Sequence, residues 1–438
     1  MRAFKDSGIE WLGEIPEYWE VVKIKHIAEK LIGGGTPDTS ISDYWSSDKS
    51  NSYLWVSIED ITKSSFIRDT SRRITQKGLE ASSAKIIPPF SILYSIYASL
   101  GKIAYSDLPV TTNQAILAIQ PKKEIFYKFL FYILHSTTKY IITLSSATTQ
   151  NNISLLIVQN LKIPLPSLEE QKAIADFLDS KCMQITNFIE KKQKLITLLN
   201  EKKQSLINEC VTKGLDKNVN FKDSGIEHLG EIPKHWEVSK IKFVAYVKGR
   251  IGFHGLNSNE FQYNEGAYLV TGNDFDNNEI SWDKCRRIGE KRFYEDPNIH
   301  LQNDDLLITK DGTIGKTAIV KKCPNQATLN TGIFLVRVRE KICSVKYLFY
   351  IINAQYFKEF VALKTCGSTI KHLYQSDFHE FKSPLPPIEE QEQIAQFLDS
   401  KISKIDKIIE KTKKQIKLIK EYKTTLINQA VCGRIGKN

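Results

Sequence analysis

The stretch FKDSGIEWLGEIPEYWEVVKIKHIA, at Phe4–Ala28, returns as FKDSGIEHLGEIPKHWEVSKIKFVA at Phe221–Ala245. Further along, KIPLPSLEEQKAIADFLDSK, which ends at Lys181, matches KSPLPPIEEQEQIAQFLDSK, which ends at Lys401. Both pairs are separated by close to half of the 438 residues, and matches this close do not arise by chance. The chain is therefore two copies of one structural unit.

Between these matching stretches the two halves diverge, although traces of a shared framework remain. FLFYI at Phe129–Ile133 aligns with YLFYI at Tyr347–Ile351, and SLGKIA at Ser99–Ala104 aligns with TIGKTA at Thr313–Ala318. Simple drift after duplication is the alternative explanation, but drift should not spare the flanks while it erases the centre. We therefore expect one fold that carries two different surfaces.

The segment after each PLP tripeptide has the features of a helix start. In the first copy, Ser167 can accept a hydrogen bond from the N3 amide while Glu170 reaches back to the cap, which is a capping box. In the second copy, Pro387 leads into Glu389 and Glu390, which suits the first turn and its positive dipole end.

Neither helical segment contains a glycine or proline before Gly214 and Gly433. Each helix should therefore run for about 45 residues, or roughly 70 Å at 1.5 Å per residue. Steps of four and three residues predict a heptad seam with polar interruptions. The predicted seam positions are Ile174, Leu178, Lys181, Ile185, Phe188, Lys192, Leu195, Leu199 and Leu206, then Ile394, Leu398, Lys401, Ile405, Ile408, Thr412, Gln415, Ile419, Tyr422 and Leu426. The two helices are expected to pair with each other, and their lysine-rich outer faces to be solvated or to face other subunits.

Short β-rich runs and helices mix in the divergent regions, from about Lys23 to Lys162 and from Lys240 to Lys382. We predict an α+β protein with two mixed α/β domains, each followed by a long helix. The two helices should form an antiparallel coiled coil with pseudo-two-fold symmetry. The predicted boundaries are residues 1–165 and 214–385 for the domains, and 166–213 and 386–438 for the helices.

The composition points to a polyanionic partner. The formal net charge is +11, which favours nucleic acid first and an anionic membrane second. No apolar run approaches the roughly 20 residues that cross a bilayer, and the first residues do not resemble a signal peptide. The seven cysteines are scattered and form no C-x-x-C, which fits reduced thiols and a cytoplasmic protein.

Reading bases requires side chains with paired donors and acceptors, and holding phosphates requires cations. Loops of the divergent regions supply both kinds of residue, although for any single one a plain solvated role fits equally well. The candidates in the first half are Lys63, Arg68, Arg72, Arg73, Tyr97, Ser99, Lys102, Gln150, Asn151 and Asn152. Those in the second half are Lys248, Arg250, His254, Asn273, Arg286, Arg287, Lys310, Thr313, Lys316, Lys371 and His372.

Motifs for catalysis and cofactor binding are incomplete in this sequence. Lys310–Thr317 ends like a P-loop but has Lys310 where the first glycine belongs, so two strands joined by a glycine turn are the better interpretation. Pro88-Pro-Phe90 lacks the Asn or Asp of an amino-methyltransferase motif, since Ile87 stands there. We therefore predict no catalytic residue, no bound cofactor and no metal, and we interpret Trp19 and Trp236 as core anchors.

The motif PLP-(S/P)-x-EEQ-x-x-IA-x-FLDSK, present twice before a long helix, resembles the specificity subunits of type I restriction-modification systems. GEIP-x-x-W near the start of each half and the duplicated layout share this resemblance, which covers essentially the whole chain. In that family each variable domain reads one half of a bipartite DNA target through the major groove. The paired helices set the distance between the halves and dock two modification subunits.

The resemblance also implies the division of labour and the region near DNA. Modification subunits would use S-adenosylmethionine, and restriction subunits ATP and magnesium, while this chain would be non-catalytic. The loops at Gly101–Lys102 and Gly315–Lys316 and the turns before each PLP are expected near DNA. Because the two variable domains differ strongly, we predict an asymmetric, two-part target.

Two other functions compete with this interpretation. A fused methyltransferase-nuclease would need cofactor and Asn/Asp-Pro-Pro-aromatic motifs, which the sequence lacks. A coiled-coil adaptor that binds only protein would not explain the positive charge or the divergent loops.

Overall fold

The computed structural model describes residues 3–97, 99–146, 152–226, 229–250, 256, 260–262, 265–365 and 372–435. The chain divides into two compact units. Unit 1 comprises Met1–Lys192 and Lys414–Asn438, and unit 2 comprises Gln193–Lys413. The helices α6 (Leu168–Lys213) and α12 (Ile388–Val431) each contribute to both units. Each unit is described by itself.

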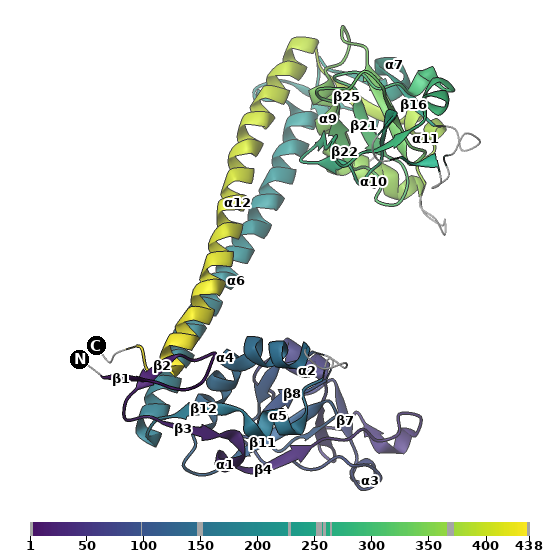
Figure 1. The fold of residues 1–438 in the computed structure, drawn as a ribbon. Coiled ribbons are helices and arrows are strands. Elements are labelled where there is room, and N and C mark those ends of the chain that lie inside the picture. Colours follow the sequence, from purple (N-terminus) through teal and green to yellow (C-terminus); the bar gives the residue numbers. More distant parts are fainter. Residues whose placement is uncertain are drawn as a thin grey trace. The chain divides into compact units, whose positions relative to one another are not determined.

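Unit 1 is built from two sheets, two small antiparallel pairs and helices (Figure 1). Strand β1 pairs with β2, β3 pairs with β12, and the sheets have the orders β4-β11-β8-β9 and β10-β6-β7-β5. The elements before α6 are β1 (Phe4–Asp6), β2 (Glu14–Pro16), β3 (Glu20–Lys23), α1 (Ile24–Ile27), β4 (Ala28–Gly33), η1 (Ser42–Tyr44), β5 (Trp45–Ser46), β6 (Tyr53–Val56), α2 (Ile58–Lys63), β7 (Arg72–Ile74), α3 (Gln76–Glu80), β8 (Ile92–Ser95), β9 (Ile103–Tyr105), β10 (Thr111–Thr112), β11 (Ile116–Pro121), α4 (Tyr127–Ser146), α5 (Leu155–Asn160) and β12 (Lys162–Leu165).

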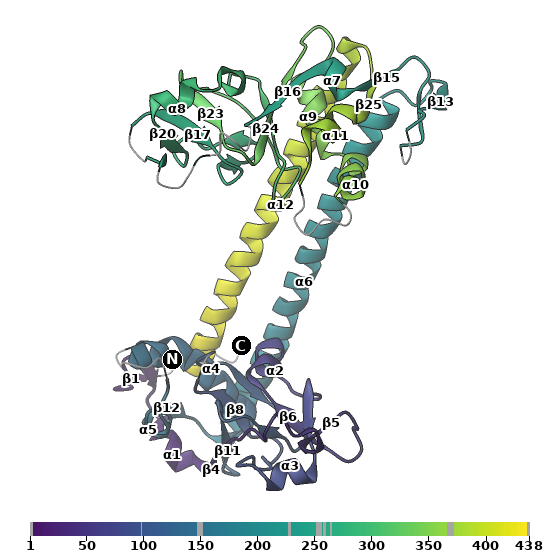
Figure 2. The same cartoon turned by 90° about the vertical axis from the view of Figure 1, so that its right-hand side faces the viewer.

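Unit 2 repeats this plan. Strand β13 pairs with β14, β15 pairs with β25, and the sheets have the orders β16-β24-β21-β22 and β20-β17-β23, with a further β18-β19 pair. Figure 2 labels β17, β20 and β23 of the second sheet. The elements before α12 are β13 (Phe221–Asp223), β14 (Glu231–Pro233), β15 (Glu237–Lys240), α7 (Ile241–Val244), β16 (Ala245–Gly249), β17 (Ala267–Val270), β18 (Phe275–Asp276), β19 (Glu279–Ile280), β20 (Arg286–Ile288), α8 (Glu290–Tyr294), η4 (Pro297–Ile299), β21 (Leu306–Thr309), β22 (Thr317–Ile319), β23 (Ala327–Leu329), β24 (Ile333–Val338), α9 (Val345–Asn353), α10 (Gln355–Lys364), α11 (Gln375–Glu380) and β25 (Lys382–Leu385).

Alternation along the strands explains how each unit is layered. Successive side chains of a strand point to opposite faces of its sheet. On β8, Ile92 and Tyr94 join the core that includes α4 and the long helices, whereas Leu93 joins the core shared with β6. On β21, Leu306 and Ile308 pack on the helices while Leu307 packs toward β17. Each unit therefore has a central sheet between a helical layer and an outer sheet, and both faces of the central sheet are apolar.

The long helices end inside these cores. The C-terminal turns of α6 place Ile207, Cys210 and Val211 in the unit 2 core, which also contains Ile394 and Leu398 near the start of α12. In unit 1, α12 contributes Leu426, Ile427 and Val431 to the core that holds the first turns of α6. Within each unit the end of one helix thus lies with the start of the other, and the predicted antiparallel pairing of two long helices is confirmed.

The phase of the predicted seam was partly wrong. Leu398, Ile405 and Thr412 are buried as predicted, but Ile408 is 48% exposed and Tyr422 is 54% exposed. The buried positions between them on α12 are Ile402, Ile409 and Ile416. On α6, Phe188 is likewise 39% exposed, and Cys182 is buried in place of Lys181. The next buried position after Leu398 lies four residues later and not three. The apolar Ile402 is therefore buried, and the charged Lys401 stays at the surface.

The doubled EEQ motif anchors each helix to its domain. The carboxylate of Glu170 accepts a hydrogen bond from the indole of the fully buried Trp19 at 3.0 Å, and Glu390 accepts one from Trp236 at 3.0 Å. Both tryptophans are thus core anchors, as predicted. Ser167 accepts from the amide of Glu170 at 3.3 Å, which is the predicted serine half of the capping box.

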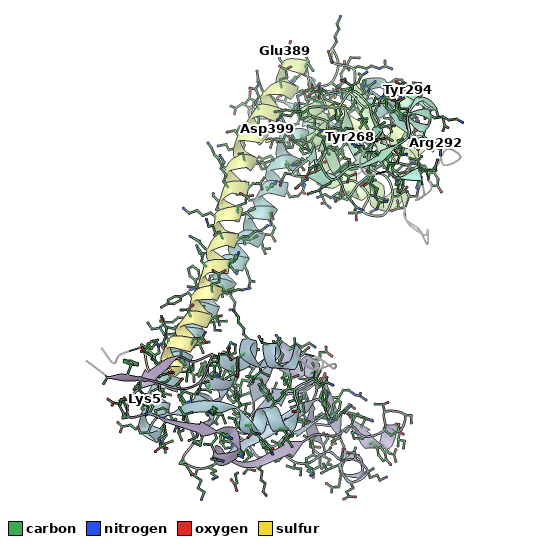
Figure 3. All side chains as sticks on the ribbon, in the orientation of Figure 1. Lys5, Tyr268, Arg292, Tyr294, Glu389 and Asp399 are labelled. Atoms are coloured by element: carbon green, nitrogen blue, oxygen red, sulfur yellow. The ribbon has the colours of Figure 1, made fainter. Side chains whose placement is uncertain are left out.

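The glutamine and aspartate of the doubled motif bind the domain as well. Gln171 is buried and accepts from the amide of Phe126 at 2.8 Å, as Gln391 does from Ser344 at 2.9 Å. A turn or two later, Asp399 (labelled in Figure 3) accepts from the hydroxyl of Tyr350 at 2.6 Å.

The aspartate of the first copy makes the same contact. Asp179 accepts from Tyr132 at 2.6 Å and also pairs with Lys128. These paired contacts explain why the motif recurs while the loops differ.

No helix in the described part of the chain is long and apolar enough to span a membrane. The six cysteines that the structure describes are free thiols. Burial raises the thiol pKa of Cys285 and Cys343 to about 12. These buried side chains therefore act as small apolar residues.

Candidate nucleic-acid interface

The outer sheet of each unit carries the tripeptide Arg-Arg-Ile on equivalent strands. It forms β7 in unit 1 and β20 in unit 2. The strand β7 pairs antiparallel with β6, whose other neighbour β10 is parallel, and β20 has the same relation to β17 and β23. The four arginines had been predicted as separate DNA candidates. The structure shows them to be two copies of one feature, which the repeated tripeptide could have revealed.

The first arginine of each pair is exposed and lies over aromatic rings. The guanidinium carbon of Arg72 lies 3.5 Å from the ring centroid of Trp45 and 5.6 Å from that of Trp55. That of Arg286 lies 4.9 Å from the ring of Phe261. A guanidinium stacked on a ring is held flat and keeps its donors free to bind a base edge or a phosphate. The rings differ between the units, so the same arginine is presented differently.

The second arginine of each pair is half-buried and holds the surrounding backbone. Arg73 donates to the hydroxyl of Ser52 at 2.8 Å and pairs with Asp69 at 3.1 Å. Arg287 donates to the carbonyl of Gly266 at 3.1 Å and lies 3.7 Å over the ring of Tyr268, labelled in Figure 3. These donors are already used within the fold, so Arg73 and Arg287 position the strand.

The glycine-lysine loops close in the same way in both units. The amide of Gly101 donates to Ser95 at 3.1 Å, and that of Gly315 donates to Thr309 at 2.9 Å. Both glycines have positive φ values, +75° and +87°. At Gly101 a Cβ atom would also lie 2.6 Å from the side chain of Thr138. The loop thus requires glycine, and it places the following lysine, Lys102 or Lys316, at the surface in each unit.

The loop of unit 2 joins two strands, as predicted. It connects β21 to the antiparallel β22, and no helix follows the lysine as a P-loop would need. Lys316 donates to the carbonyl of Gly272 at 3.2 Å, Lys310 lies 5.1 Å over the ring of Phe334, and Asp311 pairs with His372. Thr313, in the same loop, is exposed, and its carbonyl accepts a hydrogen bond from the hydroxyl of Thr309.

The remaining candidates differ in how accessible they are. Arg250 is 1% exposed and donates to the carbonyl of Leu329 at 2.9 Å, so it lies inside the domain. Arg68 lies 4.6 Å over Phe66 and 3.6 Å from Asp107, and Lys63 pairs with Glu59. Tyr97 and Asn273 are exposed, while Ser99, Asn152 and Lys248 are half-buried. Gln150, Asn151, His254 and Lys371 lie outside the described residues.

Among the residues that the structure describes, no group of three or more His, Cys, Asp or Glu side chains is placed to hold a metal ion. What the two units present instead are exposed cations on a strand and on a hairpin loop, with different neighbours in each unit. A duplicated domain with equivalent cationic elements and unlike loops defines a two-part polyanion-binding protein.

Comparison with known proteins places the chain within this class. A family model described as "Type I restriction modification DNA specificity domain" matches residues 16–200 and again 233–418. The chain belongs to this family.

Several relatives and solved structures are similar along nearly the whole chain. The specificity subunit of type I restriction enzyme MjaIX from Methanocaldococcus jannaschii is 27% identical over 454 residues, which covers 99% of this chain and 96% of the relative. A chain of a solved type I R-M system assembly has a TM-score of 0.74 at 17% identity and covers 96% of this chain and 99% of that one. The HsdS subunit from Thermoanaerobacter tengcongensis has a TM-score of 0.55 at 16% identity, with 96% and 98% coverage. At these identities the two structures show the same fold.

Proposed function

We propose that the chain is the DNA-reading subunit of a type I restriction-modification complex and that each domain reads one half of a two-part target. Its partners are double-stranded DNA, two modification subunits and restriction subunits. Those subunits supply the methyl-transfer and cleavage chemistry with S-adenosylmethionine, ATP and magnesium, and this chain carries none of it. We keep residues 1–165 and 214–385 as the recognition domains and 166–213 and 386–438 as the helical spacer.

The observation that carries the proposal is the repeated arginine strand with non-repeated surroundings. Arg72 and Arg286 occupy equivalent positions but lie on tryptophan in one unit and on phenylalanine in the other. Two copies of one domain that present the same cation to different neighbourhoods suit the reading of two unlike half-sites. The net charge of +11 supports binding to a polyanion.

A DNA-binding assay with single variants tests this proposal. Wild-type chain, with its modification subunits, should bind a duplex that carries the target, and the affinity should fall steeply between low and moderate salt. Arg72→Ala and Arg286→Ala should each weaken binding by about 1–3 kcal/mol. If the arginines touch base edges, each variant should relax selectivity at one half-site only. A protein-only adaptor would show no salt-dependent DNA binding at all.

A further inference from the structure

A cavity of unit 1 is lined by cations without any carboxylate. It has a volume of about 740 Å³ and lies where the end of α2, the β8–β9 loop, α4 and the two long helices meet. Four lysines from four different elements line it: Lys63, Lys102, Lys139 and Lys423. No aspartate or glutamate is among the lining residues. Thr186, Asn187 and Asn428 of the long helices add neutral hydrogen-bonding groups.

The equivalent cavity of unit 2 is electrically different. It has a volume of about 560 Å³ and is lined by Lys203, the equivalent loop lysine Lys316 and Lys413, but also by Asp406 and Glu410. Aligning the two FLDSK motifs makes Lys203 the counterpart of Lys423, and Asp406 the counterpart of Thr186. Lys203 pairs with Asp406 at 2.8 Å. Both units therefore have the lysine, but only unit 2 has the carboxylate that pairs with it. The counterpart of Glu410 is Glu190, which is not among the residues that line the unit 1 cavity.

The lysines in unit 1 lack that compensation. Lys63 pairs with Glu59, but Lys102, Lys139 and Lys423 make no salt bridge with any residue that the structure describes. Burial lowers the pKa of the His135 ring, and the nearby Lys423 and Lys102 lower it further. Cations held around one cavity without counter-charge repel one another, and an anion between them would relieve that repulsion.

We propose that the unit 1 cavity binds a phosphate oxyanion and that the equivalent cavity of unit 2 does not. This inference rests on the proposed function. We take the phosphate to be a backbone phosphodiester of the DNA half-site that unit 1 reads. Lys102 supports this source of phosphate, because it lies on the glycine-lysine hairpin loop. That loop is one of the exposed cationic elements that both units present. A phosphate has several acceptor oxygens, so ammonium groups from separate elements can bind it together. Free inorganic phosphate has the same chemistry and is the other possible source.

Three variants test the cavity. Lys423→Gln removes one cation, Thr186→Asp copies into unit 1 the carboxylate of unit 2, and Asp406→Thr frees Lys203 in unit 2. Thr186 is exposed, so an aspartate there should not disturb the fold, and a thermal melt checks this. Lys25→Gln is the matched control, because it removes one charge from unit 1 on α1, away from the cavity.

Two measurements on the full chain, bound to its modification subunits, separate the sources of phosphate. The first is the salt dependence of binding to a labelled duplex. With Lys423→Gln and with Thr186→Asp, the slope of log K against log salt should become shallower by about one, and affinity at moderate salt should fall several-fold. Asp406→Thr should steepen the slope, and Lys25→Gln should change neither quantity. The second measurement is calorimetry with inorganic phosphate at constant ionic strength.

The outcomes are distinguishable. A slope that is shallower by about one in both unit 1 variants, with Lys25→Gln unchanged, supports the phosphodiester. If phosphate binds the wild type but not Thr186→Asp, while DNA binding is the same in all variants, DNA as the source is overturned. If no variant differs from Lys25→Gln in either measurement, the anion site itself is overturned. Failure of the wild type to bind any duplex would instead contradict the proposed function, and calorimetry would still decide whether the cavity binds phosphate.

Discussion

At the scale of single residues, the EEQ and FLDSK motif is repeated in the two halves because its side chains bind each long helix to its domain. The EEQ glutamate accepts from a buried indole, and the glutamine caps a backbone amide of the domain in both copies. The aspartate of FLDSK accepts from a tyrosine hydroxyl in both copies. The motif therefore has a structural role. Its place at the start of each long helix could be predicted from the repeat alone.

Removing the glutamate charge at one anchor should destabilise unit 1. Glu170→Gln weakens a charge-assisted bond to the buried indole of Trp19, which should cost about 1–3 kcal/mol in the free energy of unfolding. Glu169→Gln removes the neighbouring exposed carboxylate from the same helix turn and is the control. Urea unfolding followed by tryptophan fluorescence measures both. Equal effects of the two variants would contradict the anchoring role.

A pH dependence follows from Glu380, whose carboxylate receives hydrogen bonds from Lys240 and Lys242. These lysines lower the pKa of Glu380 to about 2. A lowered folded-state pKa stabilises the fold above the unfolded-state pKa of about 4.3 and loses this effect as the pH falls toward 2. Glu380→Gln should flatten the decline of the melting temperature between these values. Glu389→Gln (Glu389 is labelled in Figure 3) should leave it unchanged, and an equal flattening would refute the assignment.

At the scale of elements, the sequence predicts the two long helices and their pairing, but it does not predict correctly which of their residues are buried. Apolar residues follow Ile405 at steps of both three (Ile408) and four (Ile409), so the sequence alone admits two phases. Burial of Ile402, Ile409 and Ile416 selects one phase, because tertiary contacts decide which face is covered. The strands were easier to predict, since strands such as β8 are apolar on both faces.

A pair of neighbouring substitutions tests the seam. Ile409 is 6% exposed and Ile408 is 48% exposed. Ile409→Ala should cost roughly 2–4 kcal/mol in the free energy of unfolding because it opens a cavity. Ile408→Ala should change it by less than about 0.5 kcal/mol, as is usual for surface positions. The reverse order in a denaturant titration would show that the predicted phase, and not the observed one, is correct.

The sequence predicts a set of candidate DNA-binding residues, but it does not show which of their side chains are exposed with free donors. Arg250 was among the candidates as a basic residue of a divergent loop, yet its side chain is buried and donates to the carbonyl of Leu329. Arg72 and Arg286 became distinguishable from Arg73 and Arg287 only once Trp45 and Phe261, which are distant in sequence, were found beside them. Residue type predicts what a side chain can bind, whereas the fold determines whether its donors are free.

At the scale of the whole molecule, each variable region leaves and re-enters the repeated framework at one place. Lys23 on β3 is the register partner of Lys162 on β12, and Lys240 on β15 is the partner of Lys382 on β25. The ends of each variable region are therefore held side by side by an antiparallel pair of strands. A region closed in this way can be exchanged without moving the framework, provided that the replacement has the same closing pair.

The central claim, that each domain reads one half of a two-part DNA target, is tested most directly by methylation mapping. Long-read sequencing would be applied to cells that contain this chain and its modification subunit, before and after Lys23–Lys162 is replaced by the variable domain of a relative. We predict an asymmetric two-part motif with adenine methylated in both halves, of which one half changes after the exchange while the other half and the spacing persist. No motif despite an active modification subunit, or a motif that the exchange leaves unchanged, would contradict the account.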